Sequence, residues 1–394
     1  MKGRNISCQL NDTQHKYDPS LFNFANDKIA MRVVNFHKSL PNYKPTPLIR
    51  LSSLADKLGI DRLFVKDESH RFDLNAFKVL GASYAIAKVL GNKLNLSDDE
   101  LTFERIVSEK FKFQKITFAT ATDGNHGRAV AWTAEKFGCK AVVYLPEGSS
   151  LARLNAIKQF GAEASIINQN YDDTVLYAEK MAKDNGWILL QDTSWAGYEK
   201  VPTYIMQGYF TLITECLYQE QEIWPTHVFL QAGVGSLAAA ILACLCSFTD
   251  KTTPVFVVVE PQGAPCLYKS IKLCDGKPFK VKGDLPTIMA GLACGEPSHI
   301  GLRILNAEAG AFIKCSDDVA RRGMRVLGNP LAGDQAIISG ESGAVTLGLV
   351  YELLSKKQYG SIKDDLRITS DSKILLFSTE GDTDPEAYRE IVWY

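Results

Sequence analysis

The chain has 394 residues, of which 46% are hydrophobic and 23% charged, a composition that argues against a disordered, collagen-like or coiled-coil protein. Its 44 basic and 45 acidic residues give a formal net charge of −1, so the basic excess of a nucleic-acid-binding protein is absent. No polybasic run indicates a membrane surface, and the polar start of the sequence lacks the apolar core of a signal peptide.

Short β-branched segments alternate with helix-like segments along most of the chain. We expect strands at residues 63–67, 115–119, 141–145, 164–167, 187–190, 228–230, 255–259 and 373–377. We expect helices at residues 127–137, 150–160 and 237–248, and another that is capped by Asp172 or Asp173 and ends near residue 185. Residues 228–248 carry no charge and are long enough to span a bilayer, but Gly233 and Gly235 interrupt them, which favours a strand, a turn and a buried helix.

This alternation predicts an α/β fold with two doubly wound, largely parallel open sheets. The segment from about 115 to 190 contains four of the expected strands with three helices between them, so we expect a smaller domain inserted in a larger one. We assign residues 1–88 and 200–394 to the large domain and 89–199 to the small one. Ligands of such sheets bind beyond the carboxyl ends of the strands, here in the cleft between the two domains.

Lys78 begins an apolar helical stretch after the first of these strands. A lysine that is held in a packed site would have a lowered pKa and could form a Schiff base. The alternative is an ordinary surface lysine, because most lysines are exposed.

Two polar loops follow strands in the central part of the chain. The first contains Thr122, Asp123, Gly124 and Asn125. Backbone N–H groups converge there at the start of a helix and can bind a carboxylate, although Asp123 and Asn125 could instead be turn and cap residues. Asp192, in the second loop, adds a carboxylate, whereas we assign no role to His126.

Two further loops follow strands nearer the C-terminus. Gly233, Val234, Gly235 and Ser236 join a strand to a helix, where glycines let the backbone approach a phosphate. The loop is neither a Walker loop nor a complete dinucleotide-binding motif. Ser378 and Thr379 begin an acidic loop after the last strand, which could also be a polar surface turn.

These loops resemble the functional segments of a known enzyme family. N-A-F-K-V-L-G-A, T-D-G-N-H-G and S-T-E-G-D-T-D resemble the Schiff-base, substrate and C-terminal segments of the fold type II, tryptophan synthase β-like pyridoxal-phosphate enzymes. Further segments resemble the diaminopropionate ammonia-lyases in particular, namely K-D-E-S-x-R-F-x-L-N-A-F-K, M-A-G-L-A-C-G-E-P, M-R-V-L-G-N-P and I-I-S-G-E-S-G-A-V. They run in order from about Lys66 to the C-terminus, so the resemblance covers most of the chain.

The resemblance implies that pyridoxal 5′-phosphate is the cofactor and lies in the cleft between the domains. Lys78 would carry it covalently, and Asn125 would hydrogen-bond its ring hydroxyl. Ser378 would face the ring nitrogen, with Thr379 as its neighbour. The phosphate would be surrounded by Gly233, Val234, Gly235 and Ser236.

The resemblance also implies the reaction, an α,β-elimination of 2,3-diaminopropionate to pyruvate and two ammonia. Residues 122–125 would bind the substrate, and Asp192 and Asp123 suit its β-ammonium by charge. Asp123 replaces a serine of related enzymes and could act as a base for one enantiomer while Lys78 serves the other, so both D and L isomers should react.

Two alternatives stay open at this point, a serine/threonine dehydratase-like ammonia-lyase of the same fold and a binding module without turnover. Related enzymes are usually homodimers, and we expect one here. The nine cysteines are an odd number without metal-ligand spacing. We therefore expect reduced thiols, a cytoplasmic location and no metal.

Overall fold

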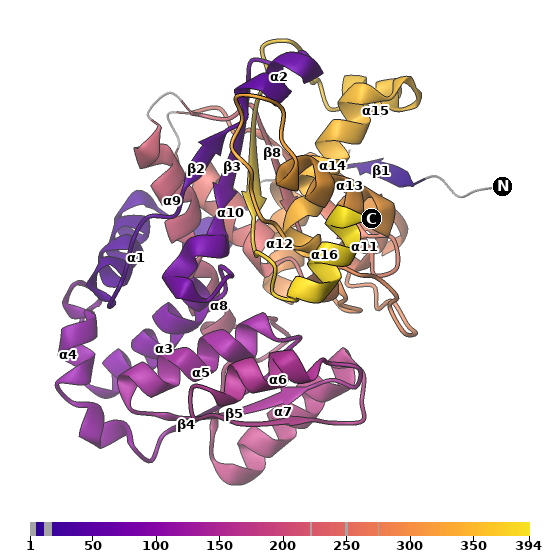
Figure 1. Ribbon diagram of the computed structural model, residues 1–394. Coiled ribbons are helices and arrows are strands. Elements are labelled where there is room, and N and C mark those ends of the chain that lie inside the picture. Colours follow the sequence, from indigo (N-terminus) through magenta and orange to yellow (C-terminus); the bar gives the residue numbers. More distant parts are fainter. Residues whose placement is uncertain (1–4, 12–17, 221–222, 249–250, 275) are drawn as a thin grey trace. The chain divides into compact units, whose positions relative to one another are not determined.

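The computed structural model describes residues 5–11, 18–220, 223–248, 251–274 and 276–394 (Figure 1). It divides into two compact units. Unit 1 consists of residues 1–23, 45–76 and 212–394, and unit 2 of residues 24–44 and 77–211.

Unit 1 is built on a seven-stranded sheet in the order β1-β10-β9-β8-β11-β3-β2. Its strands are β1 (Ile6–Leu10), β2 (Leu48–Arg50), β3 (Arg62–Asp67), β8 (His227–Gln231), β9 (Val255–Pro261), β10 (Ala311–Cys315) and β11 (Lys373–Ser378). The five central strands are parallel, whereas the edge strands β1 and β2 are antiparallel to their neighbours. The open, largely parallel sheet predicted for the large domain is confirmed.

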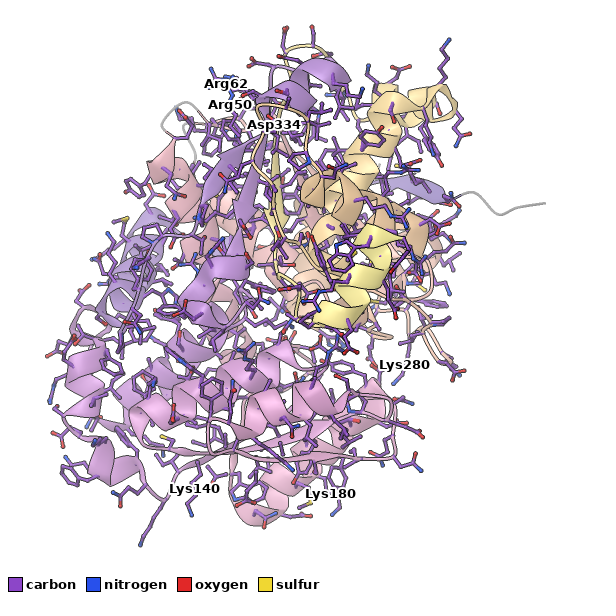
Figure 2. All side chains as sticks on the ribbon, viewed as in Figure 1. Arg50, Arg62, Lys140, Lys180, Lys280 and Asp334 are labelled. Atoms are coloured by element: carbon purple, nitrogen blue, oxygen red, sulfur yellow. The ribbon has the colours of Figure 1, made fainter. Side chains whose placement is uncertain are left out.

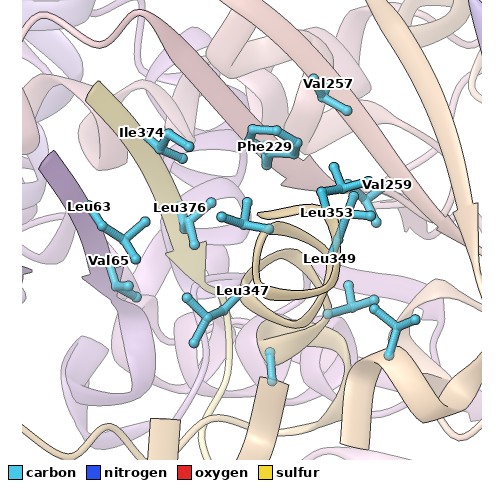
Figure 3. Close-up of a cluster of buried hydrophobic side chains, with 14 of the residues drawn as sticks. Leu63, Val65, Phe229, Val257, Val259, Leu347, Leu349, Leu353, Ile374 and Leu376 are labelled. Atoms are coloured by element: carbon cyan, nitrogen blue, oxygen red, sulfur yellow. The ribbon is translucent and has the colours of Figure 1, made fainter. Parts of the chain in front are cut away.

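Helices cover both faces of this sheet. The α-helices are α2 (Ser52–Leu58), α10 (Ser236–Cys246), α11 (Cys266–Cys274), α12 (His299–Glu308), α13 (Asp317–Gly328), α14 (Glu341–Ser355), α15 (Gly360–Asp365) and α16 (Pro385–Trp393), and the 3-10 helices are η1 (Pro19–Phe22), η2 (Glu68–Asp73), η5 (Ala290–Leu292) and η6 (Lys357–Tyr359). Val228 and Phe229 point to opposite faces of the sheet, and neither has exposed surface. Figure 3 shows Phe229 of β8 in one buried hydrophobic cluster with Leu347 and Leu353 of α14.

One of these helices receives its N-terminal cap from a distant loop. The residue that precedes α2, Leu51, offers no side-chain hydrogen bond to the helix. The carboxylate of Asp334 accepts hydrogen bonds from the backbone N–H groups of Ser53 and Leu54, both at 2.9 Å, and Figure 2 labels Asp334 beside α2. This carboxylate satisfies amides that the helix itself cannot pair.

Unit 2 contains a four-stranded, entirely parallel sheet in the order β6-β5-β4-β7. Its strands are β4 (Thr117–Ala121), β5 (Lys140–Leu145), β6 (Glu163–Ile166) and β7 (Ile188–Leu189). Its helices are α1 (Asp27–Ser39), α3 (Val79–Lys93), α4 (Phe103–Val107), α5 (Asn125–Phe137), α6 (Leu151–Lys158), α7 (Tyr171–Asn185) and α8 (Lys200–Gly208), with η3 (Asp98–Glu100) and η4 (Lys110–Phe113), while α9 (Phe210–Gln219) begins here and continues in unit 1.

The run of four strands with three intervening helices, predicted between about 115 and 190, is confirmed as β4-α5-β5-α6-β6-α7-β7. α5 and α6 cover one face of the small sheet and α7 the other (Figure 1), as right-handed crossovers require for this strand order. The predicted cap of α7 is wrong, because the side chain of Asn170, and not of Asp172 or Asp173, accepts from the helix.

Unit 2 is larger than the predicted insert at 89–199, because it also contains residues 24–44, 77–88 and 200–211. The boundary at 88 falls inside α3, a continuous helix of 15 residues that packs against α5 and α8. A Cβ at Gly81 of α3 would lie 2.6 Å from the ring of Tyr209, so α3 and the chain after α8 are packed without a gap. The predicted cleft between the domains stays a prediction.

The uncharged run at 228–248 folds as expected into β8, a glycine turn and α10, which has 11 residues. No helix among the described residues is long and apolar enough to cross a membrane.

A cluster of buried charges, which we call the β3 charge cluster, lies at the end of β3 in unit 1. It consists of Thr46, Lys66, Glu68, Arg71, Glu215 and Gln219. Lys66 donates to Glu215 at 2.6 Å, and Arg71 donates to both Glu68 and Glu215 at 2.8 Å. Burial raises the pKa of Glu215, but Arg71 and Lys66 together lower it to about 2. Two cations thus balance two carboxylates, and no charge of this set is buried alone.

A segment with strained backbone begins directly after Arg71, a member of the β3 charge cluster. Phe72, Asp73 and Asn75 have φ values of 51°, 58° and 55°, in the left-handed region that costs residues other than glycine free energy. The far end of the segment is fixed by Gly381, whose N–H donates to the carbonyl of Asn75 at 3.1 Å. A Cβ at Gly381 would lie 2.0 Å from the side chain of Asn75, which requires glycine there. The segment ends at Asn75, three residues before Lys78 in the sequence.

Gly348→Ala should destabilise the protein, because α13 and α14 are in backbone contact at this point. The added Cβ would lie 1.9 Å from the carbonyl oxygen of Val319, and backbone cannot yield as a flexible side chain can. We expect a loss of about 1–3 kcal/mol or more, seen as a lower melting temperature. Gly360→Ala is the matched control, since nothing lies within 4 Å of its Cβ. Equal melting temperatures for the two variants would contradict the close packing.

Arg71→Met should destabilise unit 1 by about 3–5 kcal/mol, because it leaves the buried carboxylates of Glu68 and Glu215 short of positive charge. Arg321→Met is the control, since the exposed pair of Arg321 with Asp318 should contribute about 0–1 kcal/mol. Thermal unfolding at neutral pH measures both losses. If the two variants lose the same stability, the β3 charge cluster does not hold the fold as argued.

Candidate active site

Lys78 is the residue that precedes α3, and its amine lies in a buried ion pair. Nζ of Lys78 donates to Oδ2 of Asp192 at 2.5 Å, and the two side chains are 17% and 6% exposed. The alternative of an ordinary surface lysine is therefore wrong. Asp192 follows β7, as predicted, and its Oδ1 accepts from Gln191 at 3.4 Å.

The pKa of Lys78 is raised, not lowered as its packed position had led us to expect. Burial lowers the pKa of this amine, but the negative charges of Asp192 and Asp123 raise it well above its usual value. Burial likewise raises the pKa of Asp192, and Lys78 lowers it to about 2. The expectation failed because the partner carboxylate lies 114 residues away in the sequence.

The loop before α5 is shaped by Thr122. Its hydroxyl accepts hydrogen bonds from the backbone N–H groups of Gly124 and Gly127, both at 2.9 Å. Thr122 thus provides a side-chain cap at this end of the helix, next to Asp123 and Asn125. Gly124 has φ of 143°, a conformation open to glycine and strained for other residues.

Asp123 and Asn125 lie on either side of Gly124 and are both half-buried. The charge of Asp123 acts on the amine of Lys78, so this carboxylate and Asp192 belong to one electrostatic site in unit 2. The carbonyl of Asp123 accepts from Arg153 at 3.3 Å, which ties the loop to α6. Asn125 is the first residue of α5.

His126 belongs to the same site, although we assigned it no role from the sequence. Its side chain is 1% exposed, and Nε2 hydrogen-bonds the carbonyl of Leu190 at 2.7 Å. Nδ1 lies 3.9 Å from Oδ2 of Asp192, the oxygen that receives Lys78. The position of His126 within T-D-G-N-H-G is the signal that could have pointed to it.

In unit 1, the predicted phosphate loop joins β8 to α10. Gly235, the residue that precedes α10, has φ of 94° and has no side chain with which to cap the helix. A Cβ at Gly233 would lie 2.9 Å from Sγ of Cys294, so a larger residue would fill the turn. The carbonyl of Val234 accepts from Ser298 at 2.8 Å, and Ser236 begins the helix.

Ser378 and Thr379 are buried where β11 ends, so the loop that they begin is not simply a polar surface turn. Oγ of Ser378 donates to Oγ of Ser339 at 2.8 Å. Oγ1 of Thr379 accepts from Nε2 of Gln231 at 2.7 Å. Of the acidic residues that follow, Asp384 caps α16 and so has a structural role.

The residues present fit pyridoxal phosphate. Unit 2 supplies a partly accessible amine that can bond to a carbonyl carbon. Unit 1 supplies a glycine turn at a helix N-terminus, which suits a phosphate, and a hydroxyl, which suits a ring nitrogen. No group of three His, Cys, Asp or Glu side chains in the described part of the chain could hold a metal ion.

Comparison with known proteins identifies the family. Residues 40–366 match the model of the pyridoxal-phosphate dependent enzymes. Diaminopropionate ammonia-lyase of Salmonella typhimurium is 47% identical over 98% of both chains, and that of Escherichia coli K12 is 48% identical over 95% of this chain and 92% of its own. The crystal structure of the E. coli enzyme with an aminoacrylate-PLP azomethine reaction intermediate matches with a TM-score of 0.90 and 45% identity, over 98% of this chain and 97% of that chain.

The E. coli enzyme has also been crystallised with D-serine, and that structure again gives a TM-score of 0.90. The fold type II resemblance is confirmed at the level of sequence and of fold. This chain belongs to the pyridoxal-phosphate dependent enzymes and, among them, to the diaminopropionate ammonia-lyase family.

Proposed function

We propose that this chain converts 2,3-diaminopropionate and water to pyruvate and two ammonia, and that it accepts both the D and the L isomer. The observation that carries the proposal is the pair of carboxylates, Asp192 and Asp123, whose charges act on the amine of Lys78. Two carboxylates and one ammonium leave a net charge of −1, which a second ammonium, that of the substrate's β-carbon, would balance. The D-serine complex of the E. coli relative supports a site that admits D-configured amino acids.

Pyridoxal 5′-phosphate, when bound, acts as an electron sink that makes the α-proton of an amino acid acidic. Lys78 would hold it covalently, Asn125 would hydrogen-bond its ring hydroxyl, and Ser378, beside Thr379, would face its ring nitrogen. The phosphate would be held by the backbone N–H groups of Gly233, Val234, Gly235 and Ser236. Val234 has a backbone N–H like its glycine neighbours, so its larger side chain does not remove a donor.

The residues of the loop before α5 would bind the substrate. Thr122 and Gly124 shape the turn, and the N-terminal end of α5 favours the negative charge of the substrate's carboxylate. Lys78 and Asp123 would each take an α-proton, one from each enantiomer, because the enantiomers present that proton on opposite sides. Asp192 would hold the β-ammonium and keep the leaving amine protonated.

A serine/threonine dehydratase-like reaction is the alternative within the same fold. A hydroxy amino acid does not require two carboxylates, and the presence of Asp123 beside Lys78 and Asp192 therefore favours the diamino substrate.

An absorbance spectrum of the purified protein with and without 2,3-diaminopropionate, coupled to a pyruvate assay, tests the proposal. Faster turnover of serine or threonine would favour the alternative, and a protein that binds the cofactor without turnover would be a binding module.

We also propose a homodimer located in the cytoplasm. The odd number of cysteines, without metal-ligand spacing, supports a reducing compartment. Light scattering on the purified protein would measure the subunit number.

Lys78→Ala should abolish the near-visible absorbance of the bound cofactor and nearly all pyruvate formation, because the covalent link requires an amine at this position. Lys93→Ala is the control, since that side chain at the end of α3 is exposed. Absorbance spectra and pyruvate assays on both variants measure cofactor attachment and turnover. A borohydride-reducible link and normal turnover in Lys78→Ala would assign the role to another lysine.

Asp123→Asn should lose most activity on one enantiomer, the D isomer, and keep more on the L isomer. Loss of a general base costs about a hundredfold to ten-thousandfold in rate, and Lys78 remains to serve the L isomer. Steady-state kinetics on each pure enantiomer measure the difference. Equal losses, chiefly through a higher KM, would mean that Asp123 only binds the β-ammonium.

A further inference from the structure

The protonation of His126 follows from its hydrogen bond. A carbonyl oxygen can only accept, so Nε2, at 2.7 Å from the carbonyl of Leu190, carries the proton of the ring. Burial lowers the pKa of His126, and the charge of Lys78 lowers it further against the opposing charges of Asp192 and Asp123. The imidazole is therefore neutral, and its Nδ1 carries a lone pair.

The nitrogen that carries this lone pair lies beside the ion pair of Lys78 and Asp192. Nδ1 is buried and has no hydrogen-bond partner among the residues that the structure describes. The nearest charged oxygen is Oδ2 of Asp192 at 3.9 Å, which cannot donate while the carboxylate is ionised. Two acceptors thus face each other, and one proton added at Nδ1 would turn this unfavourable contact into a hydrogen-bonded ion pair.

The ammonium group of Lys78 must lose a proton before its amine can react, so a nearby group has to accept that proton. Its amine reacts as a nucleophile or a base only after deprotonation, but the surrounding carboxylates raise its pKa. Asp192 keeps no proton near neutral pH, because its pKa is lowered to about 2. Tyr209, whose charge also acts on Lys78, has a phenol with a raised pKa and is not a base in that range.

We propose that His126 is the relay residue that accepts, at Nδ1, the proton that Lys78 releases, with Oδ2 of Asp192 as the bridge between them. The step moves one proton: the ammonium becomes an amine, the imidazole becomes an imidazolium, and Asp192 stays a carboxylate. The total charge of the group is unchanged, so no net charge is created in a buried place. The inference rests on the proposed role of Lys78 as the reactive amine.

The first experiment measures the pKa of His126 in the full-length apoprotein, from deuterium exchange at C2 of its ring followed by mass spectrometry. Lys78→Met removes the ammonium and should raise this pKa by about one unit or more, whereas the matched variant Lys78→Arg keeps the charge and should not. Asp192→Asn should lower it. His227 is the internal control, because it is also buried and bound to a carbonyl, that of Leu366, in unit 1. A His126 pKa that does not respond to Lys78→Met overturns the proposal.

The second experiment measures how fast the apoprotein captures pyridoxal phosphate covalently, from the growth of near-visible absorbance. His126→Gln should slow this capture about a hundredfold, and added imidazole should restore it in His126→Gly in proportion to its neutral fraction. His227→Gln, which alters a buried histidine of unit 1, should capture at the wild-type rate. A wild-type rate and pH dependence in His126→Gln would overturn the relay.

The two measurements separate failure of the relay from failure of the proposed function. Neither uses 2,3-diaminopropionate, so a protein that captures the cofactor through His126 but does not release pyruvate would refute only the proposed substrate. If His126→Gln does not fold, as circular dichroism would show, the pKa of the native His126 in the Lys78 variants still decides the inference.

Discussion

The buried ion pair between Lys78 and Asp192 is the interaction on which the chemistry of unit 2 depends. Taking both charges out of water costs more than an exposed pair would, and the short contact offsets that cost only while both groups stay ionised. The pair also fixes two loops that are distant in the sequence, since one partner precedes α3 and the other follows β7. The amine of Lys78 is thus held in its protonated form.

A second buried lysine shows why Lys78 and not Lys66 suits a reactive role. Lys66 donates to Glu215, to Gln219 and to the carbonyl of Thr46, at 2.6, 2.9 and 2.8 Å, so all three ammonium protons have acceptors. Among the described residues, Lys78 donates to one acceptor, Asp192, and its side chain is 17% exposed. An ammonium with three partners is locked in place, whereas an ammonium with one can exchange it.

The sequence predicted the features that depend on local pattern and missed those that depend on distant partners. The β4-to-β7 run was predictable because period and glycine stops are local signals, and right-handed crossovers explain which face each helix covers in the observed strand order. β1, β2 and β10 were missed, β2 because three residues are too few for a pattern. The raised pKa of Lys78 and the cap from Thr122 both needed the folded chain, because each depends on where a single side chain lies.

Neither Asp192 nor Lys78 changes its charge near neutral pH, whereas a histidine can. Asp192, whose pKa is lowered, adds stability above its unfolded value of about 4 and loses it as the pH falls toward 2. Lys78, whose pKa is raised, adds stability that is complete below its unfolded value of about 10 and is lost only as the pH rises beyond it. Between these limits neither group changes its charge with pH. The pKa of a histidine ordinarily lies inside that window and burial lowers that of His126, so His126 is the member of this group that can take up a proton as the pH falls.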